Sequence, residues 1–379
     1  MPECNYSHGS DLIKRQAAVK MIRKKFFMAF LVPMLITLAL WFSSDAVSTY
    51  ILDIRGVSSF LAADRTVGHV NKPNFSGKFG GFLDSFSTFV SIGPLGERRS
   101  SEGNCRNVPI FLFVGDSITA GLEVNDEETF VSKINSNCET THILGANFGV
   151  LGYDTHEVIA NYTRISRSIK HDAVLYLITD TDLLENTQLF PYVNIAKRFG
   201  RVFFETYYLP TISNLERAYL KFRVFASDHF YTTSTAIKLV ERWHARSEVA
   251  HTYTTIPADQ AETLIRLVKI LSAAVKRNGA TLYLAASPCV TTDPCAGPDI
   301  ERLLQNSNQS GEFIVLPLAT ELQSKFEKGE IDKRNMRFQN DVHLSSFGHG
   351  VLAEELTRLR AMSPGETQKQ LLNFWINAD

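Results

Sequence analysis

The sequence predicts an α/β fold in which a parallel sheet is covered by helices on both faces. Two observations favour this fold. From residue 108 onward, short apolar runs of strand length alternate with longer segments whose apolar residues recur at helical spacing. Repeated alternation of this kind is typical of parallel sheets, because each crossover helix packs on a face of the sheet. Ligands of such sheets bind beyond the carboxyl ends of the strands, where a functional site is therefore expected.

The predicted strands are the most apolar short runs of this region. Residues 110–114 form a short apolar run and residues 173–178 a strongly apolar one, and neither contains a charged side chain. Three further runs, at 142–148, 281–286 and 313–318, are predicted as the remaining strands of the sheet.

Helices are predicted between these strands. Residues 125–134 open with acidic side chains, which are favoured in the first turn of a helix. In residues 260–276 apolar side chains recur at helical spacing, and Asp259 is the expected N-cap. Residues 155–168 and 346–359 are predicted as two further helices.

Residues 183–256 interrupt the alternation. This stretch is too long for a simple connection between a strand and a helix. It is rich in Phe and Tyr, with Lys and Arg between them. Two interpretations stay open: a helical insertion whose aromatic residues form a small core of their own, or a cap that covers the substrate.

The amino-terminal region has the features of a membrane anchor. Residues 26–43 are uncharged and apolar, and six Lys or Arg residues lie in the preceding leader, 1–25. As a helix the apolar stretch covers roughly 25 Å, slightly less than the ~30 Å hydrocarbon core. The positive charge predicts a single-pass anchor with its amino terminus in the cytoplasm. A cleaved signal peptide ending near Ala46 and a buried core helix are the alternatives.

The anchor is expected to be followed by two regions. Residues 44–107 are predicted as a juxtamembrane segment, in which 71–81, rich in Gly, Asn and Lys, is predicted as a loop. Residues 108–379 are predicted as the catalytic domain. If the anchor is correct, this domain is periplasmic or extracellular.

Composition excludes some functions and suggests disulfides. The formal net charge of −1 argues against nucleic acid as a partner. No spacing of Cys or His residues indicates a metal site. Of the five cysteines, Cys289 and Cys295 flank a turn and are candidates for a local disulfide, which leaves Cys105 and Cys138 as a second pair. Four unpaired buried thiols are the alternative.

Three residues have the types required for nucleophilic catalysis. The apolar run at 110–114 leads directly into Gly115, Asp116 and Ser117, which brings a serine to the edge of the sheet. A serine hydroxyl becomes a nucleophile when a base removes its proton, and the base is usually a histidine held by an acceptor. Asp341 and His343 lie two positions apart, just before a predicted helix. We predict Ser117 as nucleophile, His343 as base and Asp341 as the residue that orients the base.

These motifs resemble those of a known family. Gly115-Asp116-Ser117-Ile118-Thr119, together with Asp341-Val342-His343-Leu344-Ser345, is similar to the first and last sequence blocks of the SGNH, or GDSL-type, hydrolases. The resemblance covers residues 108 to about 359 and implies the fold of that family, a flavodoxin-like three-layer α/β/α sandwich. It also implies ester hydrolysis through an acyl-enzyme, without a metal or an organic cofactor.

The resemblance implies an oxyanion hole as well. In the family two middle blocks supply a glycine and an asparagine as donors to the oxyanion. The stretch 147–155 is similar to the glycine block, with Gly152 as the donor. Thr181 occupies the position of the asparagine, and its hydroxyl can donate one hydrogen bond. The implied oxyanion hole consists of Ser117, Gly152 and Thr181.

The expected function is therefore that of a membrane-anchored serine esterase outside the cytoplasm. O-acyl esters of glycans are the first expected substrates and lipid esters the second. An O-acyltransferase of cell-envelope glycans would use the same residues, because only the acceptor of the acyl group differs. A non-catalytic envelope binding or assembly protein is the alternative from another class, and the threonine at position 181 is the feature that supports it.

Overall fold

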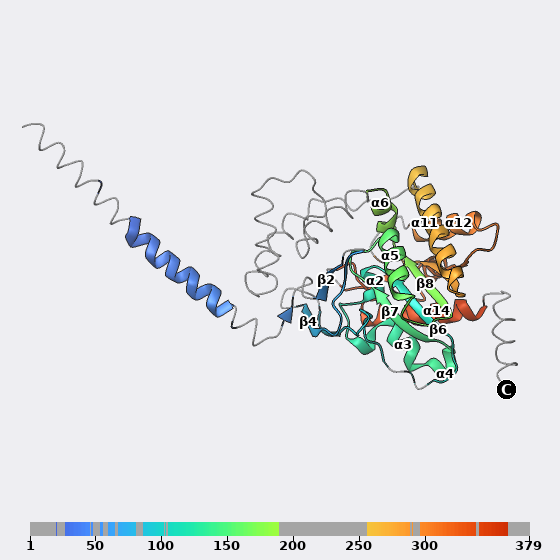
Figure 1. The fold of residues 1–379 in the computed structure, drawn as a ribbon, viewed down its shortest axis with the longest axis horizontal. Coiled ribbons are helices and arrows are strands. Elements are labelled where there is room, and N and C mark those ends of the chain that lie inside the picture. The colour runs from blue at the N-terminus through green and yellow to red at the C-terminus, as the bar shows by residue number, and fades with distance from the viewer. Residues whose placement is uncertain are drawn as a thin grey trace, which may run out of the picture.

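The structure is a computed structural model that describes part of the chain (Figure 1). Residues 189–255, which make up most of the predicted insertion, lie outside the described residues, as do Cys289 and Cys295 and nearly all of the predicted leader 1–25. The described residues are 20, 27–45, 47, 54–55, 60–64, 67–80, 86–101, 103, 105–188, 256–288, 290, 296–338 and 341–362.

The centre of the protein is a parallel sheet of five strands. Its spatial order is β10-β9-β8-β6-β7, and every neighbouring pair is parallel. Numbered along the chain within this sheet, the order is 2-1-3-4-5, which is that of the flavodoxin-like fold. The predicted fold class is thus confirmed. The strands are β6 (Ile110–Gly115), β7 (Leu144–Gly149), β8 (Ala173–Ile178), β9 (Thr281–Ala286) and β10 (Ile314–Leu316).

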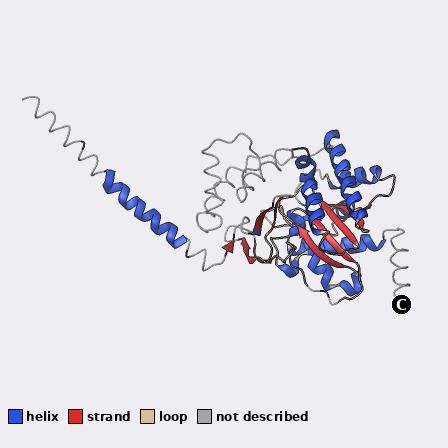
Figure 2. Ribbon diagram, viewed as in Figure 1, coloured by secondary structure: helices blue, strands red, loops and turns tan. Residues whose placement is uncertain are grey.

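Helices cover both faces of this sheet (Figure 2). Alternate residues of β6 point to opposite faces, so that Leu112 belongs to one apolar core and Phe113 to the other. The Leu112 core is covered by α5 (Thr155–Ile165), α11 (Ala258–Arg277) and α12 (Gly297–Ser307). The Phe113 core is covered by α3 (Phe130–Ser136), α13 (Leu318–Glu327) and α14 (Ser346–Met362). Shorter helices are α2 (Ser117–Ala120), η2 (Asp126–Glu128), α4 (Cys138–Thr141), α6 (Asp180–Gln188) and η4 (Lys333–Met336).

Some predicted boundaries are confirmed and others are wrong. β8 and β9 span the predicted 173–178 and 281–286. The prediction of a single helix at 125–134 is wrong. Thr129 is extended and is the N-cap of α3, so it separates η2 from α3. Asp259 is not the N-cap of α11; Pro257 holds that position and Asp259 lies in the first turn.

The region expected as a juxtamembrane segment contains β-structure. The prediction of a loop at 71–81 is wrong, because Ser76–Gly80 forms β4. In this strand the buried residues Gly77 and Phe79 alternate with the exposed residues Ser76 and Lys78. β4 pairs with two other strands, and a separate antiparallel pair lies beside them in the chain. The partners of β4 are β1 (Ile54–Arg55) and β5 (Ser87–Ser91), and the separate pair is β2 (Leu61–Asp64) with β3 (Gly68–Asn71).

This β-structure is bound to the loops that follow β6 and β7. The Asn71 side chain donates to the Gly149 carbonyl over 2.9 Å, and the Tyr153 hydroxyl donates to the His69 carbonyl over 2.6 Å. The Arg98 amide donates to the Asn147 carbonyl over 2.8 Å. Backbone groups buried in this way need partners, so the loops at the end of the sheet depend on residues 69–98 for their conformation.

A disulfide joins this region to the rest of the domain. Cys105 and Cys138 are bonded, with their Cα atoms 6.0 Å apart, which confirms the predicted pairing of these two residues. At the amino terminus, Phe27–Asp45 is one helix of 19 residues with a mean hydropathy of 1.9. The apolar part of this helix is not buried in the protein, and the helix is the blue one in Figure 1. Its length and composition suit either a membrane span or a signal sequence.

Candidate active site

Ser117 lies just past the carboxyl end of β6, the strand between β7 and β8. Asp116 is the N-cap of α2, and its Oδ1 accepts a hydrogen bond from the Ile118 amide over 2.9 Å, so that Ser117 is the first residue of the helix. A glycine is needed on the neighbouring strand, because a Cβ at Gly149 would lie 2.3 Å from the Ala120 nitrogen. Ser117 is half-buried.

The serine stands where the sheet changes direction. β6 lies between β7 and β8, and the chain order reverses there, which is the point where ligands bind in sheets of this type. The Thr179 hydroxyl, just past β8, donates to Asp116 Oδ2 over 3.1 Å and ties the two strand ends together. Burial raises the pKa of Asp116 to about 6, although its hydrogen bonds and the charge of His343 oppose the rise.

Asp341 and His343 form a hydrogen-bonded pair. His343 Nδ1 lies 2.5 Å from Asp341 Oδ1, and the same oxygen accepts the His343 amide over 3.0 Å. The carboxylate therefore holds both the ring and the backbone of the histidine, and it favours a proton on Nδ1. Nε2 is then the nitrogen left to act as a base. The predicted partnership of these two residues is present in the structure.

His343 and Ser117 are brought to the same edge of the sheet. The charges of His343 and Asp116, the residue next to Ser117, act on each other's pKa. Burial lowers the pKa of His343, but the hydrogen bond to Asp341 and the charges of Glu123, Asp341 and Asp116 outweigh burial and raise it to about 9. The imidazole is thus strongly favoured in its charged form.

Glu123 is a part of this site that the sequence analysis did not find. Its Oε1 lies 3.4 Å from His343 Nδ1, and the residue is 3% exposed. Burial raises the pKa of Glu123, and the charge of Asp341 adds to the rise, while the charge of His343 opposes it. No sequence motif marks this glutamate, because it comes near His343 only through the turn that follows α2.

His349, the other histidine of this region, has no catalytic geometry. It is 1% exposed, its ring stacks on Phe130, and its Nδ1 accepts the Phe130 amide over 3.3 Å. Burial lowers its pKa to about 3, and the nearby positive charges add to the decrease. It is therefore a neutral packing residue.

Gly152 lies in the turn that follows β7. Its φ is +68°, a conformation that a residue with a side chain rarely adopts. The turn is held on two sides, since the Val150 amide donates to the Gly115 carbonyl over 3.0 Å and the Leu151 carbonyl lies 2.8 Å from His69 Nε2. These bonds place the Gly152 turn beside the end of β6, where Ser117 begins α2.

Thr181 is exposed, and its hydroxyl has a neighbour. Thr181 Oγ1 lies 2.9 Å from Thr179 Oγ1, which also lies 3.1 Å from Asp116 Oδ2 and 3.3 Å from Asp182 Oδ2. A hydroxyl carries a single proton. When Thr179 donates its proton to a carboxylate, Thr181 must be the donor in the contact between the two threonines. Thr179 is therefore a second residue of the site that sequence reasoning missed.

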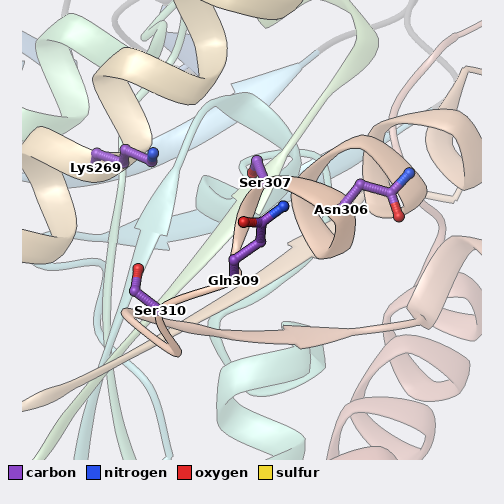
Figure 3. Close-up of a pocket in the computed structure, with 5 residues that line it drawn as sticks. All are labelled: Lys269, Asn306, Ser307, Gln309 and Ser310. Carbon is purple, nitrogen blue, oxygen red and sulfur yellow. The ribbon is translucent and has the colours of Figure 1, made fainter.

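The other features that could bind a ligand lie elsewhere. Among the described residues no group of three or more His, Cys, Asp or Glu is arranged to hold a metal ion. A polar hollow of about 510 Å³ lies between α11 and the end of α12, and Figure 3 shows Asn306 pointing away from Lys269. It contains none of the predicted catalytic residues. Its lining residues are Lys269, Asn306, Ser307, Gln309 and Ser310.

Comparison with known proteins gives similar folds only. No family model and no curated protein matches the chain. Similar solved structures include an α/β hydrolase enzyme from the metagenome of Lake Arreo, with 11% identity over 70% of this chain and 98% of that chain and a TM-score of 0.40. An acetyl xylan esterase variant from Geobacillus stearothermophilus has 12% identity over 70% and 98% of the two chains and a TM-score of 0.40. A lipolytic protein of the G-D-S-L family from Desulfitobacterium hafniense has 12% identity over 66% and 99% and a TM-score of 0.39. Each TM-score is below 0.5, so these similarities do not define the family.

Proposed function

We propose that this chain is a serine hydrolase that cleaves ester bonds through an acyl-enzyme. The observation that carries the proposal is the 2.5 Å contact between His343 Nδ1 and Asp341 Oδ1, at the sheet edge where Ser117 begins α2. A carboxylate on Nδ1 fixes the tautomer in which Nε2 can take a proton. The resemblance of both motifs to the GDSL-type hydrolases supports the same conclusion.

In the proposed mechanism, Ser117 Oγ attacks the acyl carbon while His343 Nε2 takes its proton. Asp341 stabilises the imidazolium that forms. His343 then gives the proton to the leaving alcohol, and a water molecule activated by the same histidine releases the acid and restores Ser117. The negative oxygen of each tetrahedral intermediate requires hydrogen-bond donors that are already in place.

The proposed donors are the Ser117 and Gly152 amides, with Thr181 as a third. The first residue of a helix has an amide without an intrahelical acceptor, which suits Ser117 to this role. The glycine allows the positive φ of this turn, and the hydrogen bonds of Val150 and Leu151 hold the turn in place. The Thr181 hydroxyl would have to exchange its contact with Thr179 for one with the oxyanion, which makes it the weakest of the three.

Labelling with a fluorophosphonate tests the proposal without knowledge of the substrate. Only an activated serine reacts with this probe, so we expect the full-length protein to be labelled and Ser117→Ala to be unlabelled. Ser310→Ala, in the polar hollow beside α12, is the matched control and should label like the wild type. Undiminished labelling of a folded Ser117→Ala protein would remove Ser117 as the nucleophile.

We further propose that the helix Phe27–Asp45 anchors the enzyme with its domain outside the cytoplasm. The Lys and Arg residues ahead of the helix support this orientation. The Cys105–Cys138 disulfide supports it too, because such bonds persist in oxidising compartments. O-acyl esters of glycans are the proposed substrates, with lipid esters second, on the strength of the family resemblance.

A pair of reporter fusions tests this topology. Alkaline phosphatase fused after Thr49 should be active, because this reporter folds only in an oxidising compartment. A reporter that is active only in the cytoplasm should be inactive at the same point. The reverse pattern would place the catalytic domain in the cytoplasm. Extraction of the membrane fraction with carbonate separates an anchored chain from one whose leader has been cleaved.

A further inference from the structure

The catalytic histidine of the proposed mechanism faces a carboxylate that the mechanism does not use. Glu123 Oε1 lies 3.4 Å from His343 Nδ1, the same nitrogen that contacts Asp341. Glu123 is 3% exposed, and within the described part of the chain its Oε2 has no hydrogen-bond partner. A buried carboxylate is unfavourable unless a positive charge or a donor faces it.

Glu123 is held in this position by a fully buried arginine. Arg98 donates to the Gly121 carbonyl over 2.5 Å and to the Val124 carbonyl over 2.7 Å, on either side of Glu123. Arg98 also pairs with Asp126 over 3.0 Å, and its charge favours the ionised form of Glu123 by opposing the rise in the pKa of this carboxyl. The backbone of the turn between α2 and η2 is therefore held on either side of Glu123.

We propose that Glu123 is a second carboxylate partner of His343, a positioning residue that shares with Asp341 the stabilisation of the imidazolium. The inference rests on the proposed function, in which His343 gains a proton in the transition state. A second negative charge stabilises that transition state, but it also keeps His343 protonated in the resting enzyme. The expected consequence is an enzyme that works best in alkaline solution, because only the neutral imidazole accepts the proton of Ser117.

The charged groups around His343 come from several elements. Asp341 lies on its own loop, Glu123 on the turn after α2, and Asp116 at the start of α2, and each of the three favours the charged imidazole. His349, which α14 places nearby, is neutral because burial lowers its pKa. Together the three acids raise the pKa of His343 to about 9 against the effect of burial.

The pH dependence of serine labelling measures the contribution of Glu123. In the full-length wild type, the rate of fluorophosphonate labelling should rise with pH, with the midpoint of the rise at about 9, the pKa of His343. In Glu123→Gln the midpoint of this rise should fall by about 1–3 pH units, the effect of removing one opposite charge at this distance. Labelling at pH 7 should then be faster than in the wild type. Glu127→Gln, an exposed change on the same segment, should leave the midpoint unchanged.

A second readout separates this inference from the proposed function. The imidazole signals of ¹³C-labelled histidine report the pKa of His343 directly, and His343→Gln identifies its signal. A lower pKa of His343 in Glu123→Gln supports the inference even if the protein shows no hydrolase activity. An unchanged pKa in the folded variant overturns it, even if Ser117 reacts with the probe.

Asp341→Asn provides the complementary test if Glu123→Gln does not fold. With Glu123 still in place, the pKa of His343 should remain above the ordinary value of about 6.5. A fall to that value or below would show that Asp341 alone raises the pKa, which would overturn the inference. Thermal unfolding of each variant shows whether the measured protein is folded.

Discussion

His343 and His349 lie on either side of the start of α14, and their surroundings give them opposite properties. His343 faces Asp341 at 2.5 Å and Glu123 at 3.4 Å, and its pKa is raised to about 9. His349 stacks on Phe130 in the core, and its pKa is lowered to about 3. Two histidines six positions apart are thus the proposed base in one case and a core residue in the other. The comparison shows that burial and the acids facing an imidazole, rather than its place in the chain, decide its charge.

The largest expected effect is the loss of activity in His343→Ala. Removing the base of a catalytic triad costs on the order of 10⁴-fold or more in kcat, so turnover of a short acyl ester should nearly vanish. The unfolding temperature should change least near pH 9, where the charged imidazole no longer adds to the stability of the fold.

His349→Ala should give the opposite result and serves as the control. It removes a buried ring from the core and should lower stability by a few kcal/mol, an estimate based on buried aromatic truncations. The kcat of the folded fraction should be kept. Near-normal activity of His343→Ala would reverse the assignment of the two histidines. So would a His343→Ala enzyme whose remaining activity disappears when His349 is also replaced.

A smaller loss is expected for Asp341→Asn. Loss of the orienting carboxylate costs about 10⁴-fold in a well-studied triad. Here Glu123 remains close to His343 Nδ1, so we expect a loss of only about 10²-fold, an estimate scaled down from that value. Asp341→Asn combined with Glu123→Gln should approach the loss of His343→Ala. If the effects of the two substitutions on the activation free energy simply add, the carboxylates act independently and do not share the histidine.

The two histidines should also affect stability in opposite directions with pH. The pKa of His349 is about 3 when folded and about 6.5 when unfolded, so the unfolded chain takes up the proton first as the pH falls. Stability is therefore lost between pH 6.5 and 3, by about 1.4 kcal/mol per pH unit. His343 has a raised pKa, so its contribution is full below pH 6.5 and is lost as the pH rises to about 9.

Denaturant unfolding at several pH values measures this difference. Between pH 6.5 and 5, His349→Gln should lose about 2 kcal/mol less stability than the wild type, because glutamine takes up no proton. His69, buried with a pKa lowered to about 4, adds a similar slope that both proteins share. If the free energy of unfolding fell equally steeply with pH in the two proteins, the His349 ring would have to reach solvent on acidification.

The comparison also shows where sequence reasoning is sufficient. β8 and β9 were predicted with their observed bounds, because a strand buried on both faces is a continuous apolar run. Asp341 and His343 were found because their partnership is local. Glu123 has no such signal, since its approach to His343 depends on the turn that Arg98 holds from a distant part of the chain. β4 was missed because its glycine and lysine residues are typical of loops, and pairing with β5 decided its conformation.

The smallest expected effect distinguishes Thr181 from Thr179. Thr179 is 5% exposed, and its hydroxyl bridges Asp116 and Thr181. Thr179→Val should therefore disturb the start of α2. The expected decrease in kcat is about tenfold, which corresponds to the loss of one or two buried hydrogen bonds. Thr181 is exposed, and its hydroxyl already contacts the Thr179 hydroxyl, so Thr181→Val should lower kcat only about threefold or less, with KM unchanged. Thr181→Asn should keep or raise kcat, because an amide supplies a donor that does not depend on Thr179. A loss of 10² or more in Thr181→Val, with normal unfolding temperature, would instead make this hydroxyl a principal donor to the oxyanion. Steady-state rates on a short acyl ester, measured beside thermal unfolding, decide between the two threonines.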